Sequence, residues 1–293
     1  MHDDEIEISD ALARRLLATH LPHLADLPLH RIEAWGTDHA IFRVGEDLSL
    51  RLPKIGWAAK QGEKEARWLP VLAPYLPLEI PVPIAVGDPS DDYPFHWYLS
   101  PWLIGENPTP ESGIDPHQLA LDLAAFVHAL QAVDTTGAPT PRTGQRGGPL
   151  AAADADTRIP AERLRGETDV DALLAIWDAG LHAPDWDRPG VWVHGDLSDG
   201  NLLARDGRLS GVIDWGGLIA GDPAVELMAA WNLFDAEFRD ALGFVDDAMW
   251  RRGRAWATSA SIQALPYYRD TNPVIVARSW RTVAEVLADL ERE

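Results

Sequence analysis

One short segment, VHGDLSDGNLL at residues 193–203, places a histidine, two aspartates and an asparagine on a single loop. A strand-like segment, VIDWG at 212–216, follows it and carries a further carboxylate, Asp214. Aspartate and asparagine are common turn formers, so the loop alone would not indicate a site. Together, however, the loop and the strand offer carboxylate and amide oxygens, the ligand type that suits Mg²⁺.

The spacing from His194 through Asp196 to Asn201 is H-x-D-x-x-x-x-N, the spacing of the protein-kinase catalytic loop. Phosphoryl transfer requires an aligned hydroxyl, a group that accepts its proton, and magnesium to balance the polyphosphate charge. A carboxylate near the acceptor and an oxygen ligand near the metal would meet part of that need.

The second metal carboxylate would be supplied by a hairpin. NLLARDGRLSGVID, residues 201–214, has a hairpin pattern with Asp206-Gly207 at the turn. Such a hairpin would bring Asp214 back beside Asn201. The loop and the strand therefore predict two halves of one magnesium–nucleotide site.

The elements before this site are rich in β-strand patterns. Ser9 can cap a helix whose leucines, at 12, 16 and 17, have helical spacing. Three antiparallel strands are then predicted in RIEAW, AIFRV and LSLRLP, separated by the turns GTDH and GEDL. A helix is expected from Trp57 to Tyr75, followed by strands in EIPVPIAVG and FHWYLSPWL.

The pattern becomes helical beyond Gly105. LALDLAAFVHALQAV is amphipathic, a loop rich in Pro, Gly and Thr covers 135–149, and helical segments recur near 160–182, 223–242, 246–264 and 273–290. We therefore expect an α+β protein with two lobes. The first, 1–104, would end in a hinge at SPWLIGENP, and the second, 105–293, would be mainly helical.

Composition excludes several classes of function. A hydrophobic fraction of 46% with 13 tryptophans predicts a buried core, and the absence of cysteine removes disulfides and thiolate metal sites. No apolar run is long enough to span a membrane, and MHDDEIEIS does not look like a signal peptide, so a cytoplasmic location is expected. A formal charge of −21 disfavours nucleic-acid binding. It leaves open either a solvated acidic surface or a cleft for a cationic small molecule.

The motifs resemble those of the aminoglycoside and macrolide phosphotransferase family, whose members have a protein-kinase-like fold. HGDLSDGNLL and VIDWG correspond to the family's H-G-D and I-D-[FW]-[GE]. GDPAVELMAAW is similar to its GDPA-x-D-L continuation, with Glu226 in place of the usual aspartate. The similarity runs through nearly the whole chain, from GTDHAIFRVG to the final helices.

The resemblance implies a role for each matching residue of the loop and strand. Asp196 would orient, and accept the proton of, the acceptor hydroxyl. Asn201 and Asp214 would bind magnesium, while His194 would shape the loop. Trp102 and its neighbours in LSPWL would receive the base of the nucleotide.

The small lobe departs from the kinase pattern. Arg51 stands where a lysine is usual, and an arginine can still bind phosphate bidentately, although Lys54 is a rival. Glu65 resembles the helix glutamate that pairs with this cation, with Glu63 as the competing choice. The turn GTDH at 36–39, which includes Thr37, would cover the nucleotide without a glycine-rich motif.

The acceptor should bind the helical lobe, where acidic and aromatic side chains are both available. The candidates are Asp235, Glu237, Asp240, Asp246, Asp247 and Asp270 as carboxylates, and Trp231, Phe234, Trp250, Trp256, Tyr267 and Tyr268 as aromatics. A solvated helix and a packed core would explain the same residues without a ligand.

The resulting hypothesis is a monomeric antibiotic kinase that uses ATP or GTP with Mg²⁺ and phosphorylates a macrolide or an aminoglycoside. One alternative is a metabolic kinase for choline, a sugar or an amino alcohol. The other is a nucleotide-binding regulator that has lost catalysis.

Overall fold

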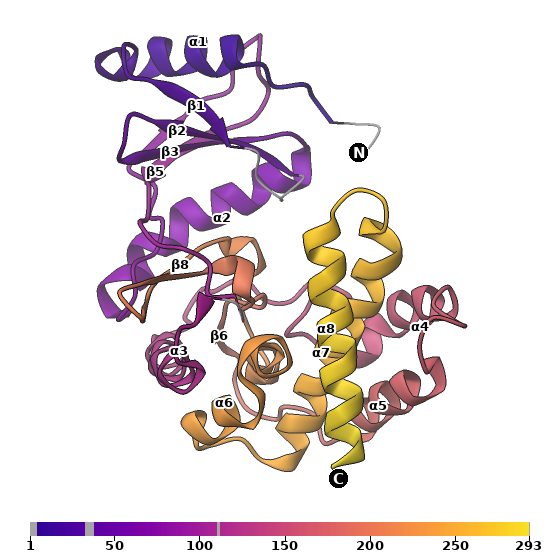
Figure 1. The fold of residues 1–293 in the computed structure, drawn as a ribbon. Helices are drawn as coiled ribbons and strands as arrows, with labels where there is room; N and C mark the ends of the chain where they lie inside the picture. Colours follow the sequence, from indigo (N-terminus) through magenta and orange to yellow (C-terminus); the bar gives the residue numbers. More distant parts are fainter. Residues whose placement is uncertain (1–4, 33–37, 110–111, 293) are drawn as a thin grey trace. The chain divides into compact units, whose positions relative to one another are not determined.

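The computed structural model describes residues 5–32, 38–109 and 112–292. Two compact units make up the chain: residues 1–105 with 211–216, and residues 106–210 with 217–293. The segment 211–216, which the sequence places in the second lobe, belongs to the first unit. An antiparallel sheet dominates the first unit and helices dominate the second, so the expected α+β class is confirmed (Figure 1).

The sheet of the first unit contains the five strands expected from the sequence. They are β1 (Leu29–Ile32), β2 (His39–Val44), β3 (Leu48–Pro53), β4 (Ala85–Gly87) and β5 (Trp97–Pro101). The order is β1-β2-β3-β5-β4, and every neighbouring pair is antiparallel. The antiparallel register of β1 with β2 and of β2 with β3 gives the expected meander.

Strand alternation gives the sheet one apolar face and one mixed face. Phe42, Leu50 and Leu99 lie on the apolar face, which packs against α1 (Asp10–His20) in the core of this unit. Ser9 caps that helix by accepting a hydrogen bond from the Leu12 amide at 3.2 Å, as expected. On the opposite face, Arg51 pairs in register with Ile41 and Tyr98.

Helix α2 (Gly56–Leu72) covers the mixed face, so α1 and α2 lie on opposite sides of the sheet (Figure 1). A close approach at Gly62 makes this possible, since a Cβ there would lie 2.1 Å from the Tyr98 ring. The three residues after α2, 73–75, continue as a 3₁₀ turn. Helix α2 thus lies over the face of the sheet that carries Arg51.

The second unit contains six α-helices within its described residues. They are α3 (Pro116–Gln131), α4 (Asp154–Glu162), α5 (Val170–His182), α6 (Asp235–Leu242), α7 (Asp247–Tyr268) and α8 (Pro273–Glu291). The segment expected as one helix at 160–182 is two, because a turn with Gly166 at φ 89° separates α4 from α5. The segment 223–242 likewise begins with 3₁₀ and π turns before α6.

Two short ladders support the loop that carries the candidate residues. β6 (Val191–Val193) pairs with β9 (Ile219–Gly221), and β7 (Leu202–Arg205) pairs with β8 (Arg208–Val212). The β7–β8 connection is the predicted hairpin, with positive φ at both Asp206 (54°) and Gly207 (76°), as a tight two-residue turn requires.

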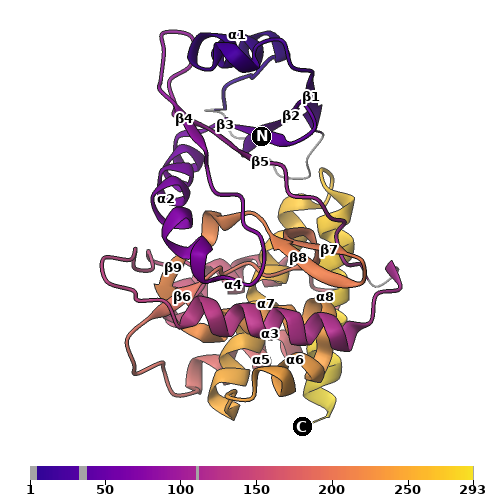
Figure 2. The ribbon, with the colours of Figure 1, turned by 90° about the vertical axis from the view of Figure 1, so that its left-hand side faces the viewer.

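Helix α3 holds the turn end of this hairpin, and Figure 2 shows the two side by side. Asp122 on α3 is buried and accepts hydrogen bonds from the Arg208 guanidinium at 2.6 and 2.8 Å and from the Leu209 amide at 3.1 Å. A bidentate arginine–carboxylate pair fixes orientation as well as distance. The strand after Asn201 is thereby attached to the helical scaffold.

A buried ion pair fixes the segment that follows β9. Asp222 accepts hydrogen bonds from Arg252 on α7 at 2.7 and 3.2 Å, and it also caps the 3₁₀ turn through the Ala224 amide. Arg252 donates a further hydrogen bond to the Pro184 carbonyl.

Within the described residues no helix has the length and hydropathy needed to cross a membrane.

We predict that Arg252→Ala destabilises the protein by about 3–5 kcal/mol, because it leaves the Asp222 carboxylate buried without its counter-charge. Urea unfolding followed by tryptophan fluorescence measures the effect. Arg165→Ala, which removes exposed ion pairs with Glu162 and Asp171, is the control and should change the midpoint little. Equal midpoints for the two variants would contradict the structural role of the Asp222–Arg252 pair.

Candidate active site

The loop 194–201 is held by its backbone. Glu226 accepts hydrogen bonds from the His194 amide and, at 3.4 Å, from the Gly195 amide. His194 is fully buried, and its Nδ1 accepts a hydrogen bond from the Asp196 amide at 3.3 Å. Gly217 lies so close to the His194 carbonyl that a Cβ would approach it to 2.4 Å. These contacts place His194 among the groups that hold the loop.

Glu226, which accepts these hydrogen bonds, is deeply buried. Its side chain is only 1% exposed, and burial raises its pKa to about 7, with the nearby Asp196 charge acting in the same direction. The amides of His194 and Gly195 oppose this shift by stabilising the ionised form. The glutamate that replaces the aspartate of the GDPA-x-D-L motif can thus reach two successive amides of the loop.

Asp196 has a partner on each carboxylate oxygen. Arg146 Nη1 lies 2.5 Å from Oδ1, and Asn201 Nδ2 lies 3.2 Å from Oδ2. Burial raises the pKa of Asp196, but the charge and hydrogen bond of Arg146 outweigh it, helped by His194 and Arg278, so the net pKa is lowered. Asp196 is therefore ionised at neutral pH. Its side chain is 34% exposed and remains reachable from solvent.

Asn201 is oriented by the same loop. Its Nδ2 also donates to the Asp196 carbonyl at 2.8 Å, so Oδ1 is the atom of this side chain that could bind a cation. Asn107 steadies the backbone on both sides, donating to the Gly200 and Leu202 carbonyls at 3.2 and 2.9 Å. An amide oxygen held in this way is a suitable ligand for Mg²⁺.

Helix α8 fixes the middle of the loop through Asp199. This carboxylate is buried and forms ion pairs with Arg278 at 2.5 Å and Arg281 at 2.6 Å. Arg278 also donates to the Ser198 hydroxyl at 3.1 Å. The second aspartate of the opening segment thus anchors the loop to α8 and leaves the exposed carboxylate to Asp196.

Arg146 is a partner of the candidate residue Asp196 that the sequence analysis did not single out. It lies in the loop 135–149, where Gln145 donates to the Gly217 carbonyl at 3.2 Å and Gly147 accepts from the Asp222 amide at 2.8 Å. Gly147 has φ 84° and packs against side chains of β6 and β9. A lone cation between glycines, QRGG, is the signal that could have marked it as a partner for an acid.

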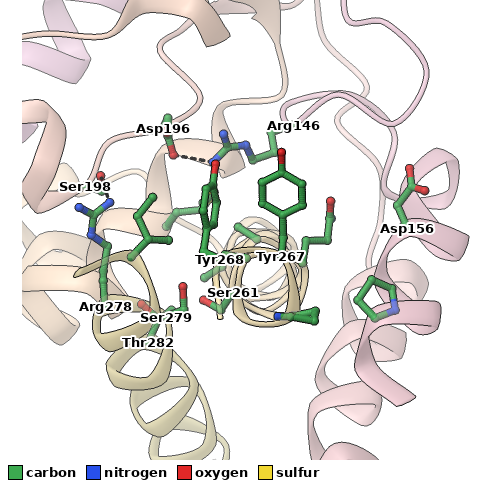
Figure 3. Close-up of a pocket in the computed structure, with 18 of the residues that line it drawn as sticks. Arg146, Asp156, Asp196, Ser198, Ser261, Tyr267, Tyr268, Arg278, Ser279 and Thr282 are labelled. Atoms are coloured by element: carbon green, nitrogen blue, oxygen red, sulfur yellow. Dashed lines mark hydrogen bonds and ion pairs between the residues drawn. The ribbon is translucent and has the colours of Figure 1, made fainter. Parts of the chain in front are cut away.

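A pocket of about 750 Å³ opens beside Asp196 in the second unit. Figure 3 shows Arg146 and Asp196 on one side of it, with side chains of α4, α7 and α8 around the rest. Of the acceptor candidates, Tyr267 and Tyr268 line this pocket.

The other acceptor candidates with described side chains do not line the pocket. Trp231, Trp250 and Trp256 are buried in the core, Asp246 caps α7, and Asp247 pairs with Arg239. Glu237, Asp240 and Asp270 are exposed away from the lining. Phe234 and Asp235 fall outside the described side chains. The acidic acceptor surface considered in the sequence analysis is therefore not part of this pocket.

The first unit brings together three of the predicted residues. Arg51 Nη1 lies 2.6 Å from Glu65 Oε2, and Glu65 is almost completely buried. Burial lowers the pKa of Arg51, but the negative charges of Glu65 and Asp214 outweigh it and raise the net pKa. Burial raises the pKa of Glu65, and Asp214 adds to the increase against the opposing charge of Arg51.

Asp214 is exposed and has a left-handed backbone conformation, φ 62°. That conformation is uncommon outside glycine and is often found at functional positions. Lys64 on α2 donates to the Gly216 carbonyl at 2.7 Å and so holds this segment. Of the two rival residues, Glu63 is exposed, while the Lys54 backbone pairs with Asp38 and Ile6.

The structure says less about the other two residues predicted for the first unit, Trp102 and Thr37. The Trp102 amide donates to the Asp47 carbonyl at 2.7 Å, and the Arg43 guanidinium lies over its ring at 5.1 Å. Thr37 lies outside the described residues. Arg51, Glu65, Trp102 and Asp214 thus belong to the first unit, whereas Asp196 and Asn201 belong to the second.

Comparison with known proteins decides the family. The profile described as "Phosphotransferase enzyme family" matches residues 29–256, a span that includes the Arg51, Asp196 and Asp214 positions. The chain belongs to this phosphotransferase family. The expected enzyme class is therefore confirmed. Among curated proteins, none matches the sequence closely enough to count as a relative.

Solved structures of the family share the fold. The GDP and kanamycin complex of APH(2")-IIia matches with a TM-score of 0.73 at 20% identity, over 94% of this chain and 98% of the other. Macrolide 2'-phosphotransferase MphH from Brachybacterium faecium matches with a TM-score of 0.63 at 26% identity, over 95% and 98%. The streptomycin–ATP complex of APH(2")-IIa gives 0.61 at 21% identity, over 97% of each chain.

We predict that Arg146→Gln shifts the acid limb of the kcat/KM profile toward higher pH. The ion pair with Arg146 keeps the pKa of Asp196 low; without it, burial dominates and the pKa rises, so the active carboxylate is lost at a higher pH. Phosphoryl-transfer rates measured across pH test this. Arg163→Gln, which changes an arginine of the same pocket, is the control, and an unshifted limb in Arg146→Gln would contradict the assignment.

Proposed function

We propose that the protein transfers the γ-phosphoryl group of ATP or GTP to a hydroxyl group of an antibiotic of the macrolide or aminoglycoside type. The observation that carries this proposal is Asp196, an ionised carboxylate held by Arg146 and Asn201 at the edge of a pocket large enough for such an acceptor. The names of the similar structures, which include kanamycin, streptomycin and macrolide enzymes, support the acceptor class.

Asp196 would act on the acceptor hydroxyl. A carboxylate has about four lone-pair positions, so its bonds to Arg146 and Asn201 leave room for a hydrogen bond from the hydroxyl. The acceptor oxygen attacks the γ-phosphorus in line as the bond to the leaving diphosphate oxygen breaks, and its proton passes to Asp196 late in the step. Alignment of the two reactants accounts for much of the rate.

Arg51 would contact the phosphates of the donor, and its ion pair with Glu65 fixes the guanidinium. Trp102 and Thr37 remain predictions for the base and for the turn covering the nucleotide. The complexes of similar proteins contain GDP and ATP, which supports both donors. The cytoplasmic location and the monomeric state also remain predictions.

Magnesium fits the donor set of the chain. Asn201 Oδ1 and the Asp214 carboxylate are hard oxygen ligands, and the chemistry of Mg²⁺ requires only one or two of these beside phosphate and water. In the described residues, no three histidine or acidic side chains cluster as a metal site. When bound, the metal would neutralise charge on the phosphates.

Asp196→Ala tests the proposal directly. We expect kcat to fall about 10²–10⁴-fold with nucleotide affinity nearly unchanged, because the carboxylate acts on the acceptor. Steady-state rates, nucleotide titration and thermal melting on one preparation separate these effects. A variant that retains most of its activity would show that the loop is a structural turn. Nucleotide binding by the wild type without turnover on any acceptor would favour the regulatory alternative.

Asp214→Asn tests the metal. We expect weaker magnesium-dependent nucleotide binding and loss of turnover, because one anionic ligand is removed. Magnesium titrations at fixed nucleotide concentration measure it. Asp91→Asn, an exposed acid in the same unit, should leave both properties unchanged. An unaltered magnesium requirement in the Asp214 variant would remove this residue from the metal site.

A further inference from the structure

The pocket beside Asp196 does not share the acidic excess of the chain. The protein has 46 acidic and 25 basic side chains, yet the lining contains three arginines, at 146, 163 and 278, and two aspartates, at 156 and 196. A ligand with several ammonium groups needs several available carboxylates, because each buried charge must be paired. The lining does not provide them.

Ion pairs among these groups leave still fewer carboxylates available to a ligand. Asp196 is bonded to Arg146, and Arg278 is bonded to Asp199 behind the lining. Within the described part of the chain, Asp156 on α4 makes no ion pair and is exposed, and Arg163 is likewise exposed. Asp156 is therefore the acid of the lining that can receive a cation, and Arg146 places a positive charge next to the catalytic carboxylate.

The rest of the lining is suited to an apolar body. Ile159 is 60% exposed and Tyr267 is 54% exposed, so both can offer apolar surface to a ligand in this pocket. The rings of Tyr267 and Tyr268 meet edge to face at 4.7 Å, and both rise from α7 toward the side of the pocket that holds Arg146 and Asp196 (Figure 3). Three alanines of α7, at 257, 260 and 264, also line the pocket.

We infer that this pocket binds a bulky, largely apolar alcohol with at most one positive charge, and that it rejects polycations. The apolar body packs on Tyr267, Tyr268 and Ile159, and the single ammonium group pairs with Asp156. Asp196, whose charge is already paired with Arg146, is not available to bind a second ammonium group. This inference rests on the proposed function for the chemistry at Asp196, and it selects between the acceptor classes.

Equilibrium binding to the full-length protein tests the inference, with erythromycin as the monoamine probe and kanamycin as the polyamine probe. Calorimetry at one ionic strength, with and without a non-hydrolysable nucleotide, gives both affinities. We expect saturable erythromycin binding and no saturable kanamycin binding over the same concentration range. Tighter or equal binding of kanamycin, or no binding of erythromycin, would overturn the inference.

Matched variants locate the binding. Asp156→Asn should weaken erythromycin binding about two- to fivefold, the range of an exposed ion pair, and Tyr268→Ala about fivefold or more. Asp185→Asn, an exposed acid of the same unit outside the lining, should have no effect. Erythromycin binding that neither pocket variant changes would place the ligand elsewhere and overturn the inference.

Mass spectrometry of erythromycin after incubation with ATP or GTP keeps the two proposals apart. Retained binding without phosphorylation of any acceptor would contradict the proposed function while supporting the pocket's preference. Phosphorylation of kanamycin in preference to erythromycin would support the proposed function and overturn the preference.

Discussion

A carboxylate that accepts a proton at neutral pH must remain ionised even where the protein partly removes it from water, and Asp196 meets this requirement through Arg146. Burial alone would raise the pKa of Asp196, and the ion pair reverses the direction. The contacts around this ion pair hold the two loops that carry Arg146 and Asp196. The loop of Arg146 is tied to Gly217 and Asp222, while Asn201, His194 and Glu226 hold the loop of Asp196.

Glu226, the second acid that supports this loop, differs from Asp196 in the direction of its pKa shift. Burial raises the pKa of Glu226 to about 7, although the loop amides and the charge of Arg146 oppose the shift. Its hydrogen bonds are to backbone amides, which fix geometry and do not depend on where other side chains point. Two neighbouring acids thus have different roles: Asp196 is kept charged and reachable, whereas Glu226 is withdrawn and orients the backbone.

The strong acidity of the chain and the charges of its pocket illustrate how little net charge reveals about a site. The sequence left open an acidic cleft for a cationic ligand. In the second unit, two acids at or near the pocket, Asp196 and Asp199, are instead paired with arginines of the loop and of α8, and Asp156 alone of the lining acids is left to a ligand. Most of the other acidic candidates lie on exposed helix surfaces or cap helices, so the net charge describes solvation more than recognition.

Local patterns determined much of the fold and part of the candidate site. Strand alternation in AIFRV and LSLRLP, the Asp206-Gly207 turn and the Ser9 cap each depend on neighbouring residues, and each prediction is confirmed. The spacing from His194 to Asn201 also lies within one loop, so the hydrogen bond from Asn201 to Asp196 follows from a contact five residues apart.

Contacts between distant segments were decided by the tertiary structure. Arg146 is 50 residues from Asp196, and no periodicity connects the two. The register of β2, β3 and β5 turns Arg51 toward Glu65, a pairing the sequence left open against Lys54 and Glu63. The pocket is built from two loops, the 3₁₀ and π turns after β9, and three helices. Propensity and spacing act over a few residues, whereas the pairing of charges and the shape of a cavity depend on how whole elements pack.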